Sequence, residues 1–386
     1  TLSSSSAASD VYKRQVVDTL RSDHIDVNGQ SVGLTPNINL LAKRGVNFLS
    51  CFANGNMTKQ SVSALFTSRY PQELGSIAFE YHSDEKSKSE FYRKKIPTLA
   101  SILKQEGYFT KAIGCMGLLC DGIGYGTDWG FDDVSIIEQS NYEPPQITYE
   151  GIRWLSENQD KKFFLLLYYG GAHGPYRPPL RFLKQGYERK FFNLNDWYRI
   201  FYRGEIAYAD YYVGIVLDTL HKLGLTEKTL IVLCSDHGDT FKKYLLESNK
   251  KNKTKEVILY DHGVSLTDDE IKVPLIISLP GKLPENKTIT ISVQLLDVVP
   301  TVLEILGINR SYYFQGASLY PIVKVEKEQS SRIIFSYGRH NYGIRVNDQY
   351  KYIYNFDTYS KKNMRRVVEQ EEIYDLKNDP MEDINI

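Results

Sequence analysis

The chain of 386 residues is long enough for one large α/β domain with a small appendage, or for two domains. Its 42% hydrophobic and 24% charged residues are typical of a globular protein. Its 47 basic residues balance 47 acidic ones, and this zero net charge argues against a nucleic-acid-binding surface. The four cysteines, Cys51, Cys115, Cys120 and Cys234, form neither a small-domain disulfide framework nor a zinc-type Cys-x-x-Cys pair.

Residues 1–15, TLSSSSAASDVYKRQ, are Ser-rich and carry no hydrophobic periodicity, and their ending resembles translated sequencing-adaptor sequence. We therefore expect them to be a non-native or unstructured segment outside the fold. The folded chain is expected to begin at Val16, inside a strand that ends at Asp18. Any native signal peptide or membrane anchor would precede this point, so composition and pattern assign no compartment.

From Val16 to residue 310, strand-like runs alternate with helical patterns. The segment TPNINLLAKRG predicts a helix capped by Thr35 with Pro36 at its first position, and IPTLASILKQEG repeats this design. The runs KKFFLLLYYGG, KTLIVLCSDHG and KVPLIISLPG are almost continuously apolar, which is typical of parallel strands covered on both faces. A helical period over 204–224 separates the first two runs. This alternation predicts a doubly wound α/β sheet.

After residue 310 the pattern changes. Residues 332–356 read as short alternating strands with Gly and Asn-Asp turns, which predicts an antiparallel hairpin or small sheet. We therefore expect an α/β domain over 16–310 and a small α+β subdomain over 311–386, whose abrupt end is consistent with truncation. Two charged segments, 82–95 and 242–256, are predicted to be solvated surface loops.

Polar residues follow the predicted strand ends, where doubly wound sheets bind their ligands. Asp18 ends the first run, and His173 follows the turn after KKFFLLLYYGG. Asp236 and His237 follow KTLIVLC, and His262 stands shortly before KVPLII. Singly, such residues are most often turn formers, helix caps or structural histidines. Together, two Asp and three His at one edge of a sheet suit a divalent metal such as Zn²⁺ or Mn²⁺.

The stretch NGNMTKQSVSALFTSRYP places Thr58 at the start of a predicted helix. Its hydroxyl is either an N-cap or a nucleophile held where a helix N-terminus favours an incoming anion. Beside the predicted metal site the nucleophile is favoured, because a metal lowers the pKa of the hydroxyl and neutralises charge on a phosphate-like oxygen.

The order of segments in this chain resembles the sulfatase branch of the alkaline-phosphatase superfamily from Asp18 to Pro380. The segments are VDTLRSDH, TPNINLLAKRGVNF, TKQSVSALFTSRYP, AHGPY, ADYYVG, SDHGD, DHGVSL with IKVPLII, YKYI, and YDLKNDP. The resemblance implies a large mixed sheet between helices, followed by a small C-terminal antiparallel sheet. It also implies a periplasmic, extracellular or membrane-anchored enzyme.

Position by position, the resemblance implies that Asp18, Asp236 and His237 hold one divalent metal ion (Mn, Zn, Mg or Ca). The second Asp that is familiar in the family is replaced here by Thr19, as in its Asp-Thr-Leu-Arg subgroup. The metal site would therefore use fewer carboxylates.

The same comparison implies three catalytic roles. Thr58 stands at the position of the nucleophile. His173 matches a histidine near the leaving oxygen of the ester, where it would act as a general acid. His262 matches a His or Lys that contacts the anionic group of the substrate.

Two departures from the family pattern concern the substrate. Thr58, Gln60 and Val62 replace the Cys or Ser, the Pro or Ala, and the Arg that sulfatases use to make formylglycine. Because threonine carries a methyl on Cβ, it cannot become that aldehyde. The usual Gly-Lys-Trp-His sulfate-binding run reads Gly-Cys-Met-Gly at 114–117, so both of its cationic contacts are missing.

Three hypotheses follow. The sequence favours a metal-dependent phosphoester hydrolase or transferase with Thr58 as nucleophile. The second is sulfate ester hydrolysis without formylglycine, and the third is a catalytically silent glycan- or envelope-binding module. In the first two the partner is an anionic ester of a glycan or a lipid headgroup, and none of the three involves nucleic acid.

Overall fold

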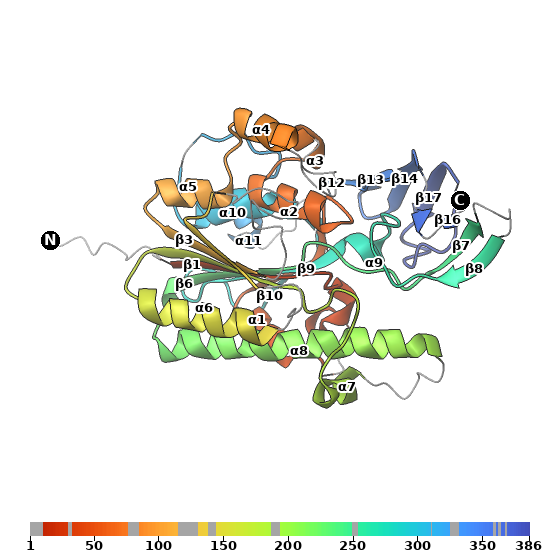
Figure 1. The fold of residues 1–386 in the computed structure, drawn as a ribbon. Helices are drawn as coiled ribbons and strands as arrows, with labels where there is room; N and C mark the ends of the chain where they lie inside the picture. The colour runs from red at the N-terminus through yellow and green to blue at the C-terminus, as the bar shows by residue number, and fades with distance from the viewer. Residues whose placement is uncertain are drawn as a thin grey trace.

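The structure is a computed structural model. A mixed sheet forms its centre (Figure 1). The structure describes residues 11–29, 33–75, 85–114, 130–137, 144–186, 194–248, 254–309, 311–324, 332–357, 360–361, 364–366 and 369–386. Across the sheet the strand order is β10-β2-β9-β6-β1-β5-β3-β4, with β11 paired to β2. The strands are β1 Val11–Val17, β2 Val46–Phe52, β3 Phe109–Gly114, β4 Asp133–Ile136, β5 Phe163–Tyr169, β6 Thr229–Cys234, β9 Lys272–Ser278, β10 Lys287–Ile289 and β11 Val293–Gln294.

Helices cover both faces of this sheet, as the alternating pattern predicts. Figure 1 shows α2, α5 and α10 above the sheet and α1, α6 and α8 below it. These helices are α1 Pro36–Lys43, α2 Thr58–Thr67, α5 Leu99–Gln105, α6 Pro144–Asn158, α8 Leu194–Lys222 and α10 Val298–Ile305. Further helices in the described parts are α3 Pro71–Leu74, α4 Glu85–Arg93, α7 Leu180–Gly186, α9 Asp268–Ile271 and α11 Tyr320–Lys324. Among the described residues, no helix combines the length and apolarity needed to cross a membrane.

Two of the three apolar runs are parallel strands, but the third is not. β5 and β6 both pair in parallel with β1, whereas β9 is antiparallel to both β6 and β2. The prediction of a parallel strand over KVPLIISLPG is therefore wrong in direction. The cause is that β9 lies between two other strands and is buried from Val273 to Ser278. A strand covered on both faces is apolar whichever way it runs.

The folded chain begins earlier than the sequence predicts. β1 starts at Val11, which pairs with Phe163 of β5 on one side and with Thr229 of β6 on the other. The expectation that everything before Val16 lies outside the fold is therefore wrong for residues 11–15. A strand at this place satisfies the backbone groups of both neighbours, and that requirement leaves no mark in side-chain periodicity.

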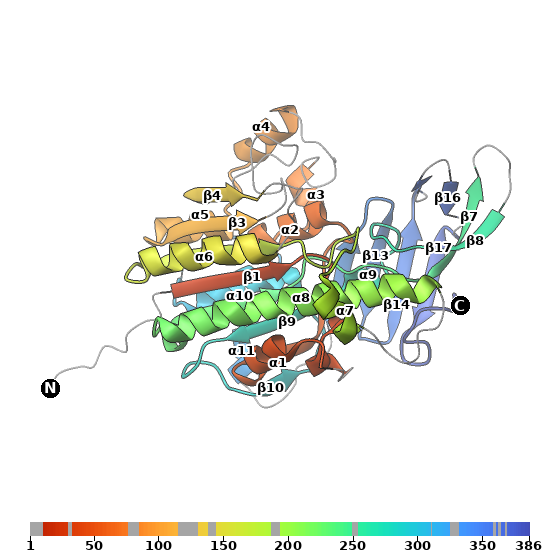
Figure 2. The ribbon, with the colours of Figure 1, turned by 60° about the horizontal axis from the view of Figure 1, so that its bottom comes forward.

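The small antiparallel sheet expected after residue 310 is present. It contains β12 Ile333–Tyr337, β13 Asn341–Val346, β14 Tyr350–Asn355 and β17 Glu371–Asp375, in that order. Figure 2 shows it beside the end of the main sheet that lies away from the N-terminus.

Neither charged segment is simply a loop. Within 82–95, residues 85–93 form α4. Within 242–256 lie β7 Lys243–Ser248 and the start of β8 Thr254–Ile258, which form a hairpin. The order of this second small sheet is β15-β16-β7-β8, with β15 Ser360–Lys361 and β16 Met364–Arg366. Thus the expected division at residue 310 does not separate the chain in space, because the hairpin pairs with strands from beyond it.

A buried lysine joins the C-terminal sheet to the main domain. Lys351 of β14 is 1% exposed, and its ammonium group donates to the Leu266 carbonyl at 3.0 Å and to the carboxylate of Asp268. It also forms an ion pair with Glu382. Although burial raises the pKa of Asp268, Lys351 and Arg345 hold it below its ordinary value. Burial raises the pKa of Glu382 to about 7, against the attraction of Lys351.

We expect Lys351→Met to lower the free energy of unfolding by about 3–5 kcal/mol, because it leaves buried carboxylates without their shared cation. Chemical denaturation of both proteins measures this. Lys104→Met removes a lysine that is 53% exposed and pairs with Asp132, so it should change stability by less than about 1 kcal/mol. Similar losses in the two variants would contradict a special role for the buried site.

The N-terminus of α1 is capped from a distant helix. Thr35 makes no cap hydrogen bond with its side chain, which corrects the sequence prediction. Instead, the Asp210 carboxylate of α8 accepts from the backbone N–H of Ile38 at 2.8 Å and of Asn37 at 3.2 Å. Thr35 is occupied elsewhere, because its hydroxyl accepts from the N–H of Asp26 at 2.9 Å.

Burial raises the pKa of Asp210 to about 6 from an ordinary value near 3.8. Folding therefore favours the protonated form of Asp210. The stability that protonated Asp210 contributes is complete below pH 4 and is lost as the pH rises through 6. We expect the stability difference between wild type and Asp210→Asn to shift by up to about 3 kcal/mol over this window, at about 1.4 kcal/mol per pKa unit. Denaturation at several pH values measures the difference, and a constant value from pH 4 to 7 would contradict the assignment.

Candidate active site

The predicted metal ligands meet where the parallel strands end. Asp18 follows β1, and its N–H donates to the carbonyl of Tyr169, the last residue of β5, at 2.8 Å. Asp236 and His237 follow β6 after one residue. Each of these three side chains offers a donor atom within 4.8 Å of the others, and all are buried. Neighbouring parallel strands thus bring together residues that are more than 200 positions apart.

His237 presents a lone pair to this cluster. Its Nδ1–H donates to the Gly238 carbonyl at 2.9 Å, which leaves Nε2 as the unprotonated nitrogen. Nε2 lies 3.6 Å from Oδ1 of Asp18 and 3.5 Å from Oδ2 of Asp236. Burial lowers the pKa of His237 to about 4, so the ring is neutral at pH 7. A neutral imidazole whose other nitrogen is fixed by a carbonyl is the form that binds metals.

The two carboxylates differ in how they are satisfied. Asp236 accepts from the N–H of His237 at 2.9 Å and from the hydroxyl of Tyr168 at 2.9 Å. Both oxygens of Asp18 are buried without a hydrogen-bond partner. Burial and the neighbouring Asp236 raise the pKa of Asp18 well above its ordinary value. A buried carboxyl group left unsatisfied is costly. A divalent cation would compensate it, so the residues present fit such an ion.

Thr58 faces this cluster and does not cap its helix. It is the first residue of α2, and Met57, which occupies the N-cap position, makes no cap hydrogen bond with its side chain. The Thr58 hydroxyl lies 3.0 Å from Nε2 of His237, and the residue is 8% exposed. The capping alternative therefore does not describe its contact, whereas its role as a nucleophile stays a prediction.

The other two histidines predicted for the site, His173 and His262, lie beside the cluster. The rings of His173 and His262 are 5.0 Å apart between centroids, and those of His262 and His237 are 4.5 Å apart. His173 donates from Nδ1 to the Gly174 carbonyl at 2.6 Å. Burial and the neighbouring His262 lower the pKa of His173. Burial by itself would lower the pKa of His262, but the neighbouring Asp239 raises this pKa above its ordinary value.

Sequence reasoning missed Asp239 and Tyr176. Oδ1 of Asp239 accepts from Nδ1 of His262 at 3.4 Å, and its other oxygen accepts from the hydroxyl of Tyr176. Both residues lie inside segments already singled out, SDHGD and AHGPY. Their signal was the spacing from Asp236 and His173, but only the fold shows that they support His262.

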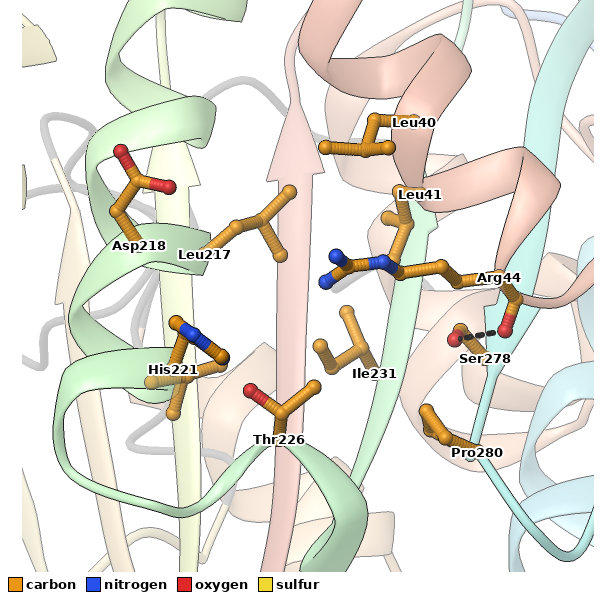
Figure 3. Close-up of a pocket in the computed structure, with 11 residues that line it drawn as sticks. Leu40, Leu41, Arg44, Leu217, Asp218, His221, Thr226, Ile231, Ser278 and Pro280 are labelled. Atoms are coloured by element: carbon orange, nitrogen blue, oxygen red, sulfur yellow. Dashed lines mark hydrogen bonds between the residues drawn. The ribbon is translucent and has the colours of Figure 1, made fainter.

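A cavity of about 720 Å³ opens beside these groups. The described residues that line it are His173, Gly174, Pro175, Tyr176, Trp197, Tyr198, Phe201, Asp239, Tyr260, Asp261 and His262. The altered sulfate-binding run continues from Gly114 into 115–117, which lie outside the described residues. A smaller cavity of about 90 Å³ lies between α1 and α8, where Ser278 donates to the carbonyl of Arg44 at 2.6 Å (Figure 3). It contains none of the predicted site residues.

The mixed sheet with Asp and His side chains at its carboxyl edge is the arrangement that the resemblance to the alkaline-phosphatase superfamily implies. The sequence model of the Sulfatase family matches residues 16–308, and that of "N-sulphoglucosamine sulphohydrolase, C-terminal" matches residues 255–386. Because the first match covers most of the chain, the chain belongs to the sulfatase family. The start of the second match, within β8, agrees with the pairing of the β7–β8 hairpin with C-terminal strands.

Similar proteins extend over almost the whole chain. A "Sulfatase" of Formosa agariphila is 25% identical over 91% of this chain and 78% of its own length. A solved structure in complex with its substrate D-glucosamine-2-N,6-O-disulfate has a TM-score of 0.73 at 18% identity, covering 97% of this chain and 93% of the other. The phosphonate monoester hydrolase of Agrobacterium radiobacter has a TM-score of 0.72 at 17% identity, covering 97% and 91%. These structural matches establish the fold.

We expect a divalent cation to raise the melting temperature of the wild type, because binding to the folded state alone adds about 2.7 kcal/mol at a hundredfold excess over Kd. Asp18→Asn should lose this response, and without metal it should melt above the wild type because the unfavourable interaction between two buried carboxyl groups is gone. Thermal unfolding after chelation, with Mn²⁺, Zn²⁺, Mg²⁺ or Ca²⁺ added in turn, measures both effects.

Asp133→Asn is the matched control, since that carboxylate lies on β4 with 52% of its side chain exposed. It should keep the full metal response. A metal response that survives in Asp18→Asn would place the ion elsewhere.

Proposed function

We propose that the protein hydrolyses a sulfate ester at the Thr58–His237 site, with one divalent metal ion held by Asp18, Asp236 and His237. The observation that carries this proposal is the convergence of the Thr58 hydroxyl, the lone pair of His237 and the unsatisfied Asp18 carboxyl group, in a chain of the sulfatase family. Family membership favours a sulfate ester over the phosphoester that the sequence favoured.

The substrate we propose is an anionic ester of a sugar. The Formosa relative is named a sulfatase, and one similar structure holds a sulfated glucosamine as its substrate. In this chain, Asp239 favours the protonated form of His262, which can therefore contact a negatively charged ester group. Asp239 and Tyr176 together fix the position of that ring.

The proposed reaction has two halves. The Thr58 oxygen attacks sulfur while the bond from sulfur to the alcohol oxygen breaks. His173 takes up a proton on Nε2, the ring nitrogen that is not bonded to the Gly174 carbonyl, and gives it to that oxygen. The proton that Thr58 gives up balances the one the alcohol receives. Water then attacks the sulfur of the threonine ester, so Thr58 regains its hydroxyl and sulfate leaves. A bound divalent ion would lower the pKa of the Thr58 hydroxyl and neutralise charge on a substrate oxygen.

A phosphoester is the second candidate, and the identity of Thr58 favours it. An unmodified hydroxyl beside a metal attacks phosphorus in the same geometry, whereas the formylglycine of other sulfatases cannot form from threonine. Water or an acceptor alcohol would then resolve the phosphothreonine. A direct comparison of the two ester types distinguishes the candidates.

We expect metal-dependent hydrolysis of p-nitrophenyl sulfate to exceed that of bis-p-nitrophenyl phosphate, with kcat/KM falling at least about a thousandfold in Thr58→Ala. Thr58→Ser keeps the hydroxyl and should stay within about tenfold of wild type. Thr226→Ala, which alters the distant small cavity, is the control and should be unchanged. Sulfate ester turnover that survives in Thr58→Ala would rule out this nucleophile, and turnover of the phosphodiester alone would establish the second candidate.

A further inference from the structure

The turn before Thr58 packs against the loop that leads from the site to α9. A Cβ atom at Gly263 would lie only 3.0 Å from Cγ of Met57, the residue before Thr58. Gly263 also has a φ of 74°, a conformation that favours glycine. The side-chain amide of Asn56 donates to the carbonyl of Ser265 at 2.6 Å. Two segments that are far apart in the sequence are therefore in direct contact beside the site.

The buried carboxyl group of Glu270, in α9, reinforces this contact. Its Oε2 accepts from the N–H of Val264 at 3.0 Å and from the amide of Asn56 at 3.3 Å. Its Oε1 accepts from the N–H of Ser265 at 2.9 Å. Glu270 and Asn56 are both 0% exposed, so no water competes for these bonds. The side chain of Glu270 thus joins the loop after the site to the turn before α2.

The main chain of Glu270 reaches a metal ligand as well. Its carbonyl oxygen accepts from the N–H of Gly238, the residue after His237, at 2.7 Å. A Cβ atom at Gly238 would lie 2.2 Å from the carbonyl oxygen of Asp269, so the two segments approach closely. The Thr58 hydroxyl and Nε2 of His237, 3.0 Å apart, therefore belong to two segments that both bond to Glu270.

We propose that Asn56 and Glu270 are positioning residues, which hold the Thr58 oxygen in line for attack by fixing the turn before α2. We call this pair the buried clamp. It contacts neither the ester nor the metal in the proposed reaction and acts through the backbone next to Thr58. Such positioning matters because a displacement of about 1 Å can cost about a hundredfold in rate. The inference rests on the proposed function for the identity of the nucleophile, but binding tests it separately.

Glu270→Gln is the test variant, because it keeps the size of the side chain. Both oxygens of a carboxyl group can accept hydrogen bonds whether or not the group carries a proton, whereas an amide nitrogen only donates. Whichever way the new amide turns, the N–H of Val264 or of Ser265 then faces another donor. Asn56→Ala removes the other member of the clamp and provides the test if Glu270→Gln does not fold.

Turnover is measured first, on metal-loaded protein. In the clamp variants, kcat for p-nitrophenyl sulfate should fall about a hundredfold while KM stays within about threefold of wild type. A general loss of folded protein would lower the number of active molecules without this dependence on the reacting geometry. A folded Glu270→Gln with wild-type kcat would overturn the proposal.

Binding of vanadate and of sulfate to the metal-loaded protein is measured by calorimetry. The Thr58 oxygen can add to vanadium as a fifth ligand, its proton passing to a vanadate oxygen, and this adduct resembles the transition state. Wild type should therefore bind vanadate at least about tenfold more tightly than sulfate, and the clamp variants should lose most of this preference. A wild type without the preference, or clamp variants that keep it, would overturn the proposal.

Glu372→Gln is the matched control. Glu372 is 3% exposed, and its partners Asn355 and Tyr374 belong to the C-terminal sheet. This variant also loses a buried acceptor, so its melting temperature should fall, but its kcat and its preference for vanadate should equal those of wild type. Equal losses of kcat in Glu372→Gln and Glu270→Gln would assign the effect to general destabilisation and overturn the proposal.

The two proposals fail in different ways. If the clamp variants lose the preference for vanadate but wild type cleaves neither ester, the buried clamp stands and the proposed reaction is wrong. If wild type cleaves the sulfate ester through Thr58 and folded Glu270→Gln keeps the wild-type kcat, the reaction stands and the clamp does not position the nucleophile.

Discussion

The site depends on two carboxylates, Asp18 and Asp236, buried side by side at the ends of neighbouring strands. Asp236 is satisfied by hydrogen bonds, whereas Asp18 is not, and burial raises the pKa of Asp18. Such a pair is stable only where the surrounding structure fixes it or a cation compensates it. The parallel ladder of β1 and β6 fixes the backbone that leads to both residues. The unsatisfied carboxyl group of Asp18 is the reason that the function proposed above includes a divalent ion at this point.

The other side of the site is positioned by the C-terminal part of the chain. The β7–β8 hairpin separates Asp239 from His262 in sequence, and the backbone bridge between Thr240 and Asp261 closes its base and returns the chain to the site. The far part of the hairpin pairs with β16, while Lys351 joins β14 to the loop and helix that lead into β9. The second small sheet and this buried ion cluster therefore help to hold His262 where it meets His237 and His173.

The residues of the site and the residues of the cavity concern different parts of the proposed substrate. In the proposed function, Thr58, His237 and the two carboxylates act on the ester group, and their arrangement carries no information about the alcohol. Trp197, Tyr198 and Tyr260 line the cavity beside these groups. On this proposal, a family member without the formylglycine sequence keeps the scaffold and differs from its relatives in its nucleophile.

By itself the sequence determined the α/β fold and the placement of Asp18, Asp236 and His237, because residues that follow parallel strands must meet at one edge. It did not determine the direction of β9, since a strand buried on both faces reads the same either way. It also missed the hairpin, whose partner strand lies more than 100 residues away. The capping of α1 by Asp210 and the support of His262 by Asp239 likewise arise only from packing. Local pattern records burial and periodicity, whereas these contacts join residues from separate elements, and so the tertiary structure decided them.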